Sequence, residues 1–449
     1  MRRAHELPYL TPAAGILAVL AAMASVRLGP VVPVLVAAPV LGMVLVTRRS
    51  DATALILPLC LVPFAVSAGG VYASASDLLV VGLGGCLLLA GAAGFAQQRL
   101  GSPLTVPALA FVAWTLMSAV WSAVPLKALV DAGQRLEFTV LGVALIAALP
   151  LDGRHIRRTL AGFVAGATAL GLATIVAGFA EHRFIGVYPL GIHKNAAGSL
   201  LSYGLLATIG LRLAVPRGTI DRWLAAASLV IATGLVFTGS RGAWVGTLVA
   251  GATMVVLRRR HLLWPVTSIT VVAVALFLLV LPPDTLAEQA GFDERYSTAS
   301  VRADTWGDGV RTIAADPVLG VGAGNFIARL DGRNFQADPN NVFLLTWAET
   351  GLPGLLLLLW LFGACLRLAW RNAFSATGPG TATAASQIGV ALLVSAVVHG
   401  QFDVFWTRGT GLAAFLGAGL VAWAHRAIAD ERSRRPSAQP SRSATSRSR

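Results

Sequence analysis

Apolar runs long enough to cross a lipid bilayer recur along most of this 449-residue chain. Of its residues, 56% are hydrophobic and only 12% are charged, whereas a soluble domain carries about 25% charged residues. A run of roughly 17 to 25 apolar residues has the length of a transmembrane helix. Because the bilayer core offers no water to pair backbone groups, each such run must be helical. The sequence therefore predicts an all-α polytopic membrane protein.

The apolar runs predict about 14 transmembrane helices, and a count of about 12 to 14 fits the pattern. The predicted spans are 11–27, 30–46, 52–70, 77–96, 104–124, 132–150, 159–180, 195–214, 222–238, 241–257, 262–281, 341–366, 384–401 and 405–425. Together they form one helical bundle over 1–425. The Ser/Arg/Pro-rich tail, 426–449, has too few apolar residues to fold alone and is expected to be disordered.

Arginine-rich loops alternate along the chain with loops rich in other polar residues, and this alternation predicts the orientation of the bundle. Arginines cluster in alternate loops, at 48–49, 154–158, 212–222 and 258–260 among others, and cationic residues beside a span resist translocation. These loops are therefore expected on the cytoplasmic side, with both termini. The other loops are richer in polar chemistry and are expected on the external side of a bacterial plasma membrane.

Charge and cysteine content exclude several classes of function. The net charge of +14 comes from arginines in short clusters between apolar runs, so it indicates membrane topology and anionic-lipid contact rather than nucleic-acid binding. Cys60, Cys86 and Cys365 lie far apart in apolar surroundings and have no metal-ligand spacing. We therefore expect no nucleic-acid partner, no metal site, no cofactor and no disulfide.

One connection, 282–340, is much longer than the others and is expected to form the large external loop. Within it, Ser300 is placed to cap a helix that ends near Asp316. Val301, Trp306 and further apolar residues lie along one side of that helix. Such an amphipathic helix is expected to lie on the membrane surface or on the bundle. The glycine-rich run at 320–324 lacks the Lys and Ser/Thr of a phosphate-binding loop and is expected to be a flexible turn.

Three segments carry chemistry, and all three fall on the predicted external face. The first is a tight turn between two spans, TGSRGA at 238–243. The second combines RADTW at 302–306 with DPVLGVG at 316–322. The third is the pair Asn340-Asn341, followed after nine residues by GLPG at 351–354.

Together, over roughly 190–425, these segments resemble the O-antigen ligase and polymerase family. The resemblance implies a multi-span, metal-independent glycosyltransferase that moves glycans from undecaprenyl diphosphate carriers to an acceptor hydroxyl. It places this reaction at the outer face of the plasma membrane, in the synthesis of cell-surface polysaccharide. The implied partners are the lipid-linked glycan, a glycan, lipid or protein acceptor, and membrane lipids.

Two arginines match the family's diphosphate-binding positions. The resemblance implies that Arg241, in the turn, and Arg302, in the long loop, contact the carrier's diphosphate. Guanidinium suits this task because it stays charged and presents a planar fork to phosphate oxygens. The structural alternatives are an interfacial arginine that reaches lipid headgroups, for Arg241, and a plain surface arginine, for Arg302.

The third segment departs from the family pattern. Asn340 stands where the family has the histidine thought to accept the acceptor's proton, and an amide cannot take up a proton at neutral pH. Asn340 and Asn341 can still orient a hydroxyl or a phosphate oxygen. A general base must then come from another side chain.

The remaining candidates are external polar residues, and each has a structural alternative. His193, Lys194 and Asn195 are expected to bind substrate or simply to cap a helix. His399 is expected to bind substrate or to form an interfacial pair with Asp403. Glu349 is about two turns into its span, where a carboxylate needs a partner or a polar cavity. Asp338 is a further possible base or a surface residue.

The preferred function is transfer or polymerisation of a lipid-linked glycan. One rival is a transporter or flippase of lipid-linked glycan, although such proteins often show internal repeats, and no clear repeat relates the two halves here. The other rival is an inactive relative that binds the lipid-linked glycan without turning it over.

Overall fold

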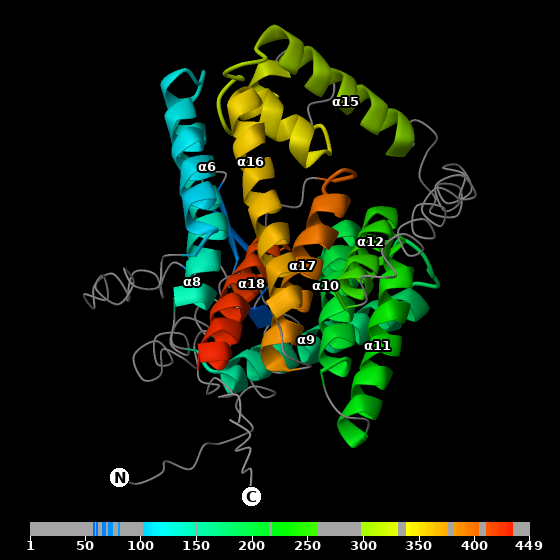
Figure 1. Cartoon of the computed structure of the whole chain (residues 1–449). Helices are drawn as coiled ribbons and strands as arrows, with labels where there is room; N and C mark the ends of the chain where they lie inside the picture. Colours follow the sequence, from blue (N-terminus) through cyan, green and yellow to red (C-terminus); the bar gives the residue numbers. More distant parts are fainter. Residues whose placement is uncertain are drawn as a thin grey trace, which may run out of the picture.

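The structure is a computed structural model of the whole chain. It describes residues 57–58, 60–61, 65–68, 71–74, 80, 102–148, 151–214, 218–258, 298–330, 338–375, 380–403 and 410–433. The predicted spans 11–27, 30–46 and 262–281 lie outside these residues, as does almost all of span 77–96. Figure 1 shows the described chain as a bundle of helices with one helix, α15, lying across one end.

The described elements are helical apart from one short ribbon. Their order is β1 (Ala65–Ala68), β2 (Val71–Ser74), α6 (Thr105–Met117), α7 (Pro125–Arg135), α8 (Gly142–Ala148), α9 (Gly153–Ala180), α10 (Lys194–Arg212), α11 (Thr219–Thr238), α12 (Arg241–Arg258), α15 (Thr298–Ala315), α16 (Val342–Ser375), α17 (Thr381–His399) and α18 (Thr410–Ser433). A π-helical segment, Leu136–Leu141, joins α7 to α8, and short 3-10 turns occupy Ser118–Val120, Pro189–Gly191 and Ile327–Leu330.

Five of the described helices, α9, α11, α16, α17 and α18, are long and apolar enough to cross a membrane. The prediction of a helical, multi-pass membrane protein is therefore confirmed. Every predicted span between 104 and 425 coincides with a helix or a continuous helical run, except 262–281, which is not described. The count of 14, the positions of the termini and the sidedness stay predictions.

The span predicted at 52–70 is wrong in its second half. Residues Ala65–Ala68 form strand β1, which pairs antiparallel with β2 from Ala65 opposite Ser74 to Ala68 opposite Val71. The error has a physical reason, because a short apolar run between a proline and a pair of glycines, here Pro63 and Gly69-Gly70, fits a strand as well as a helix. Helix α18 also continues to Ser433, so the expectation of disorder is wrong for residues 426–433. The rest of the expected tail lies outside the described residues.

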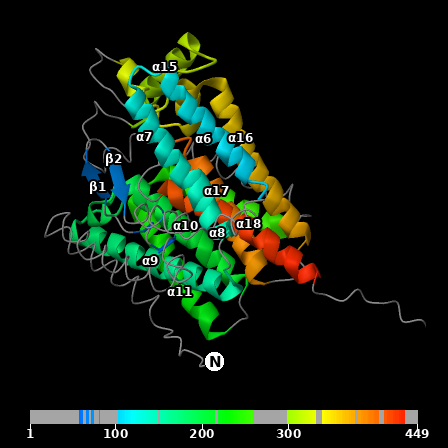
Figure 2. The ribbon, with the colours of Figure 1, turned by 90° about the vertical axis from the view of Figure 1, so that its left-hand side faces the viewer.

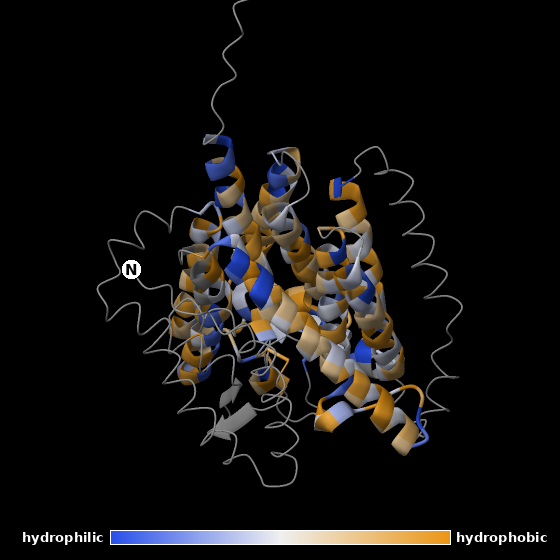
Figure 3. Ribbon diagram, turned by 90° about the horizontal axis from the view of Figure 1, so that it is seen from below, coloured by the Kyte–Doolittle hydropathy of each residue, from blue (hydrophilic) through white to orange (hydrophobic). Residues whose placement is uncertain are grey.

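Small residues bring the central helices into close contact. Helices α17 and α18 are the most buried of the five candidate spans, and Gly389 and Gly417 bring their backbones together at a position where neither has room for a Cβ atom. Gly246 of α12 has the same role against Ser395 of α17. Such contacts suit a bilayer, where helices associate through close packing rather than through the hydrophobic effect. In Figure 3 the helices are mostly apolar in colour, with strongly polar segments at several helix ends.

Helix α16 bends at Gly351, which has a backbone φ of +67°, just before Pro353. Proline has no N–H, and the Leu352 N–H donates instead to the Pro317 carbonyl at 3.0 Å. The carbonyls of Ala348 and Glu349 consequently lack their usual donors within the helix. The N–H groups of Val321 and Gly322 donate to them, at 2.9 and 2.8 Å.

The loop that fills this bend, residues 316–326, is held from the other side by α6, which Figure 2 shows in front of α16. Trp114 Nε1 donates to the Thr350 carbonyl at 2.7 Å, and Trp121 Nε1 donates to the Leu319 carbonyl at 3.1 Å. Gly320, Gly322 and Gly324 in this loop all have positive φ angles. The glycine run at 320–324 is therefore a fixed part of the fold, and the expectation of a flexible turn was wrong.

Helix α15 confirms the amphipathic helix expected in the long loop, but it begins at Thr298, two residues before Ser300. Its packed side carries Thr305, Asp308 and Thr312, all buried, while Val310 is 56% exposed. Among the described side chains of the predicted apolar side, Ile313 is the one that packs on a buried cluster. The helix thus lies on the bundle through small and polar residues and presents much of its apolar side outward.

Gly351→Ala is expected to destabilise the protein. The substitution places a Cβ against the Val318 carbonyl and forces a glycine-only backbone conformation, which costs about 1 to 3 kcal/mol before the steric clash is added. The measurement is thermal unfolding of the purified protein in detergent. The control is Gly363→Ala on the same helix, where nothing lies within 4 Å of the new Cβ and about 0.5 to 1 kcal/mol should be gained. Equal unfolding temperatures for both variants would contradict this account of the bend.

Candidate functional site

The ends of several helices meet at one end of the bundle, next to the turn between α11 and α12. Gly239 ends α11 in a left-handed conformation, with φ of +62°, and packs against Ile185 and Gly186 of the loop before α10. Arg241 begins α12. Gly242 follows it, and a Cβ there would stand 2.6 Å from Cδ2 of His399 at the end of α17. The glycines on both sides of Arg241 are thus required for the turn and for its contact with α17.

Cationic side chains from four parts of the chain gather at this end. The charges of Arg183, Arg241 and Arg302 all act on Lys194, as does the opposite charge of Asp403. Burial lowers the pKa of Arg302, with Arg241 acting in the same direction and Asp403 opposing it. We call these five residues the cationic cluster. Lys194 thus lies near three arginines and one carboxylate, so the cationic cluster has a net positive charge.

Polar contacts beneath the cationic cluster connect α10 to α17. Asn195 Nδ2 donates to Asp403 Oδ2 at 2.5 Å, and Ser199 Oγ lies 2.6 Å from His399 Nδ1. His399 is only 3% exposed. One turn along, Ser202 Oγ lies 2.8 Å from Ser395 Oγ. These bonds fix Asp403 and His399 relative to the first turn of α10.

The two asparagines of the third segment lie beside this end of α17. Asn340 has a left-handed backbone, with φ of +50°, which asparagine tolerates better than most residues. The Asn341 side-chain oxygen caps α16 by accepting from the N–H groups of Phe343 and Leu344 at 3.0 and 3.1 Å. The Val342 N–H donates to the Gly400 carbonyl at 2.7 Å, which joins the segment to the residue after His399. Asn341 therefore has a structural role whatever else it does.

Glu349 belongs to a second group of charges, at the junction of α7 and α16. Its Oε2 accepts from Arg135 Nη2 at 3.1 Å, and Arg135 Nε lies 2.6 Å from Asp131 Oδ2. The Arg135 guanidinium also lies over the ring of Phe111, 5.4 Å from its centroid. We call Asp131, Arg135, Asp338 and Glu349 the acidic cluster, since the charges of Asp131, Arg135 and Asp338 all act on Glu349.

Asp338 connects the acidic cluster to the third segment, since it stands two residues before Asn340. Burial and the nearby charge of Asp131 raise the pKa of the Asp338 carboxyl above its usual range. Pro339, between them, packs near Gly309 of α15. Arg302 lies two turns earlier on the same helix, or about 10 Å along its axis. Helix α15 therefore passes over both clusters.

The structure brings together some of the predicted site residues and separates others. Arg241, Arg302, Lys194, Asn195 and His399 belong to one region, at or next to the cationic cluster. His193 stands at its edge as the N-cap of α10, where its Nδ1 accepts from the Asn195 N–H at 3.4 Å. Glu349 lies apart, in the acidic cluster, where its carboxylate is paired.

Sequence reasoning missed Arg183, Arg135 and Asp131. Arg135 offered a signal, because an arginine inside the predicted span 132–150 needs a buried partner. Asp131 precedes it by one helical turn, which is the spacing of a helical ion pair. Arg183 offered none, since nothing in a single sequence places its loop beside Lys194.

The comparisons with known proteins agree with the motifs. The family model described as O-antigen ligase matches residues 226–359, a segment that includes Arg241, Arg302, Asn340 and Glu349. This segment is similar to the O-antigen ligase family. The matched segment is narrower than the region 190–425 in which the resemblance was expected.

A curated O-antigen ligase from Pseudomonas aeruginosa strain PAO1 is a relative of this chain. The two are 26% identical over 275 residues, which make up 61% of this chain and 66% of the relative. The similarity thus extends well beyond the matched family segment. It spans just under two thirds of the relative's length.

The buried pair of Arg135 and Glu349 predicts a pattern of stabilities. Arg135→Ala should lower the free energy of unfolding by about 3 to 5 kcal/mol, because it leaves the buried Glu349 carboxylate without its partner. Glu349→Ala should cost less, because Arg135 keeps its ion pair with Asp131. The double variant Arg135→Ala/Glu349→Ala should lose less stability than the sum of the two single losses. Thermal unfolding in detergent measures all three. A double variant whose loss equals the sum of the single losses would show that the two side chains do not interact.

Proposed function

We propose that this protein transfers a glycan from an undecaprenyl diphosphate carrier to an acceptor hydroxyl, at the external face of a bacterial plasma membrane. The proposal covers both ligation to a different acceptor and polymerisation onto another glycan, which are the same exchange of bonds. The match of residues 226–359 to the O-antigen ligase family model and the similarity to a curated O-antigen ligase support glycan transfer in general. The arginine-rich loops at the opposite end of the bundle support the external placement.

The observation that carries the proposal is the cationic cluster. A glycan-diphosphate-lipid has two negative charges, and the departing lipid diphosphate has a third. Three arginines and a lysine around one carboxylate suit such a head, and guanidinium groups bind phosphate oxygens in pairs. Charge that develops during the reaction is best stabilised by groups already fixed in place. Arg241 and Arg302 are fixed by the start of α12 and by α15.

The reaction then needs few groups. The acceptor oxygen attacks the anomeric carbon, the bond from that carbon to the phosphate oxygen breaks, and its electron pair stays on the diphosphate. The energy is already in the sugar-phosphate bond, so the donor supplies its own driving force. The acceptor's proton must pass to a base, and Asn340 cannot take it.

We assign the base to Asp338. Its position two residues before Asn340 is close to where the family has its histidine, and its raised pKa makes it a stronger base than an ordinary carboxylate. Burial and the like charge of Asp131 both raise the Asp338 pKa. The acceptor would approach from the acidic cluster and the donor head from the cationic cluster, with Asn340 between them.

Arg241→Ala and Arg302→Ala should each lower kcat by about 100- to 1000-fold, the usual cost of removing one stabilising donor from a developing charge. The assay follows release of lipid diphosphate from a fluorescent undecaprenyl diphosphate glycan. Arg212→Ala is the matched control, since Arg212 pairs with Asp221 at the opposite end of the bundle and its loss should leave turnover unchanged. Full turnover by both site variants would refute the assignment. Donor binding without turnover by the unaltered protein would indicate an inactive relative.

Asp338→Asn should lower kcat strongly, because it removes the base. Activity of the unaltered protein should be lost as the pH falls through the Asp338 pKa, above the usual range for aspartate, because the protonated carboxyl cannot accept a proton. Adding Asn340→His to Asp338→Asn should restore part of the activity, with the loss now near pH 6.5, the ordinary value for histidine. A pH-rate profile measures each step. An unchanged profile in Asp338→Asn would exclude Asp338 as the base.

A further inference from the structure

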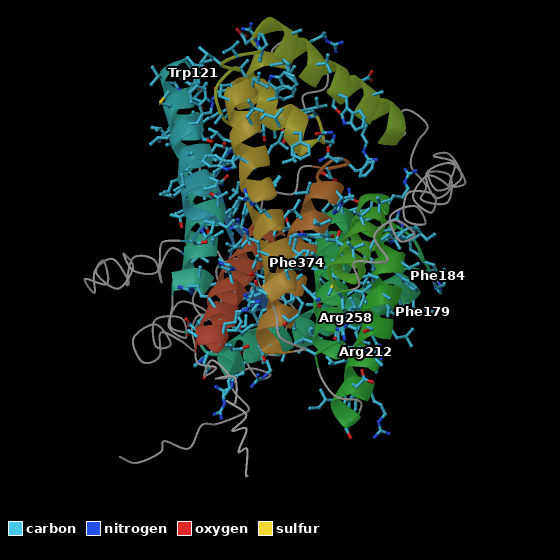
Figure 4. The ribbon with its side chains drawn as sticks, viewed as in Figure 1. Trp121, Phe179, Phe184, Arg212, Arg258 and Phe374 are labelled. Atoms are coloured by element: carbon cyan, nitrogen blue, oxygen red, sulfur yellow. The ribbon has the colours of Figure 1, made fainter. Side chains whose placement is uncertain are left out.

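Three phenylalanines form a small aromatic surface at the edge of the bundle. Phe179 comes from α9, Phe184 from the loop after it and Phe237 from α11. Their ring centroids lie 5.5, 5.9 and 6.0 Å apart, which are contact distances for aromatic rings. Phe179 is 59% exposed and Phe184 is 52% exposed. Figure 4 shows these two side chains next to each other at the outer edge of the helices.

The aromatic surface is structurally continuous with the cationic cluster. Arg183 of the cluster directly precedes Phe184. The Val187 N–H donates to the Phe237 carbonyl at 3.1 Å, which ties the loop to the end of α11. The same loop packs on Gly239, two residues before Arg241. A ligand that touches the guanidinium groups of Arg183 and Arg241 therefore has this surface beside it.

The surface is entirely apolar, which constrains its occupant. Residues that mark the membrane boundary are usually tryptophan and tyrosine, whose polar atoms reach water. Phenylalanine has no such atom, so three of them beside a cluster of cations suit a ligand with an anionic head and an apolar tail. An isoprenoid chain joined to a diphosphate is such a ligand.

The chain of the ligand cannot pass between the two helices that carry the surface. Deeper in the bilayer, α9 and α11 touch at Gly171 and Gly234, where a Cβ on Gly234 would stand 2.7 Å from the Gly171 Cα. A tail that starts at Phe184 must therefore lie over the outside of these helices, in contact with lipid. The carrier can then enter and leave sideways from the bilayer.

We propose that the surface formed by Phe179, Phe184 and Phe237 binds the first isoprenoid units of the carrier lipid, while the cationic cluster binds its diphosphate. This inference rests on the proposed function, because it assumes the same lipid carrier. Beyond the proposed function, the inference specifies the side of the bundle from which the carrier enters. It also specifies the residues that recognise the carrier's lipid part.

The kinetic test compares two donors that carry the same glycan diphosphate, one on undecaprenol and one on an ethyl group. Phe184→Ser and Phe179→Ser should raise KM for the undecaprenyl donor about tenfold, equivalent to about 1.4 kcal/mol. They should leave kcat, and the KM of the ethyl donor, unchanged. Phe374→Ser is the matched control, since Phe374 is an exposed ring, 49% accessible, that also packs on an aromatic neighbour. Equal effects on both donors, or none, would overturn the proposal.

A binding test is independent of turnover. A photoreactive phenylalanine at position 184 should crosslink to undecaprenyl diphosphate far more than one at position 374. Unlabelled undecaprenyl diphosphate should compete, and undecaprenol without its diphosphate should not. Equal crosslinking at the two positions, or equal competition by undecaprenol, would show ordinary lipid contact and overturn the inference. Selective crosslinking by a protein that releases no lipid diphosphate would support this surface while refuting glycan transfer.

Discussion

The cationic side chains of the cluster repel one another, and contacts between the helices that carry them hold them together. Lys194 begins α10 and Arg241 begins α12, and these helices meet where Gly198 lies against Ser240, with no room for a Cβ at Gly198. Asp403, which follows α17, offsets part of this repulsion with its negative charge. Three arginines and a lysine around one carboxylate leave the cationic cluster with a net positive charge, which suits an anionic ligand.

A bilayer leaves no backbone group without a partner, and that constraint explains the bend in α16. The carbonyls released near Gly351 and Pro353 accept hydrogen bonds from the loop 316–326 rather than from their own helix. That loop is thereby fixed, and α15, which leads into it, lies over the end of the bundle. Arg302 reaches the cationic cluster because of this chain of contacts.

The sequence alone predicted most of the described helices and part of the candidate site. Apolar length located the described spans between 104 and 425 because the bilayer thickness dictates their length. It failed at 52–70, where a strand and a helix have the same short apolar pattern. The motifs located Arg241 and Arg302 through a resemblance, but a single sequence does not show which helix ends are neighbours. For that reason Arg183 was missed, and Glu349 was grouped with residues from which the fold separates it.

In the proposed reaction, the cationic cluster under α15 holds the leaving group and the acidic cluster receives the acceptor. This arrangement depends on Arg241 and Arg302 facing the same side of the membrane, outside the cell. The direct measurement is labelling with a membrane-impermeant maleimide in spheroplasts of a variant without its native cysteines. The account predicts that Arg241→Cys and Arg302→Cys both react from outside and that added undecaprenyl diphosphate slows both reactions. Reaction of either position only after the membrane is permeabilised would contradict it.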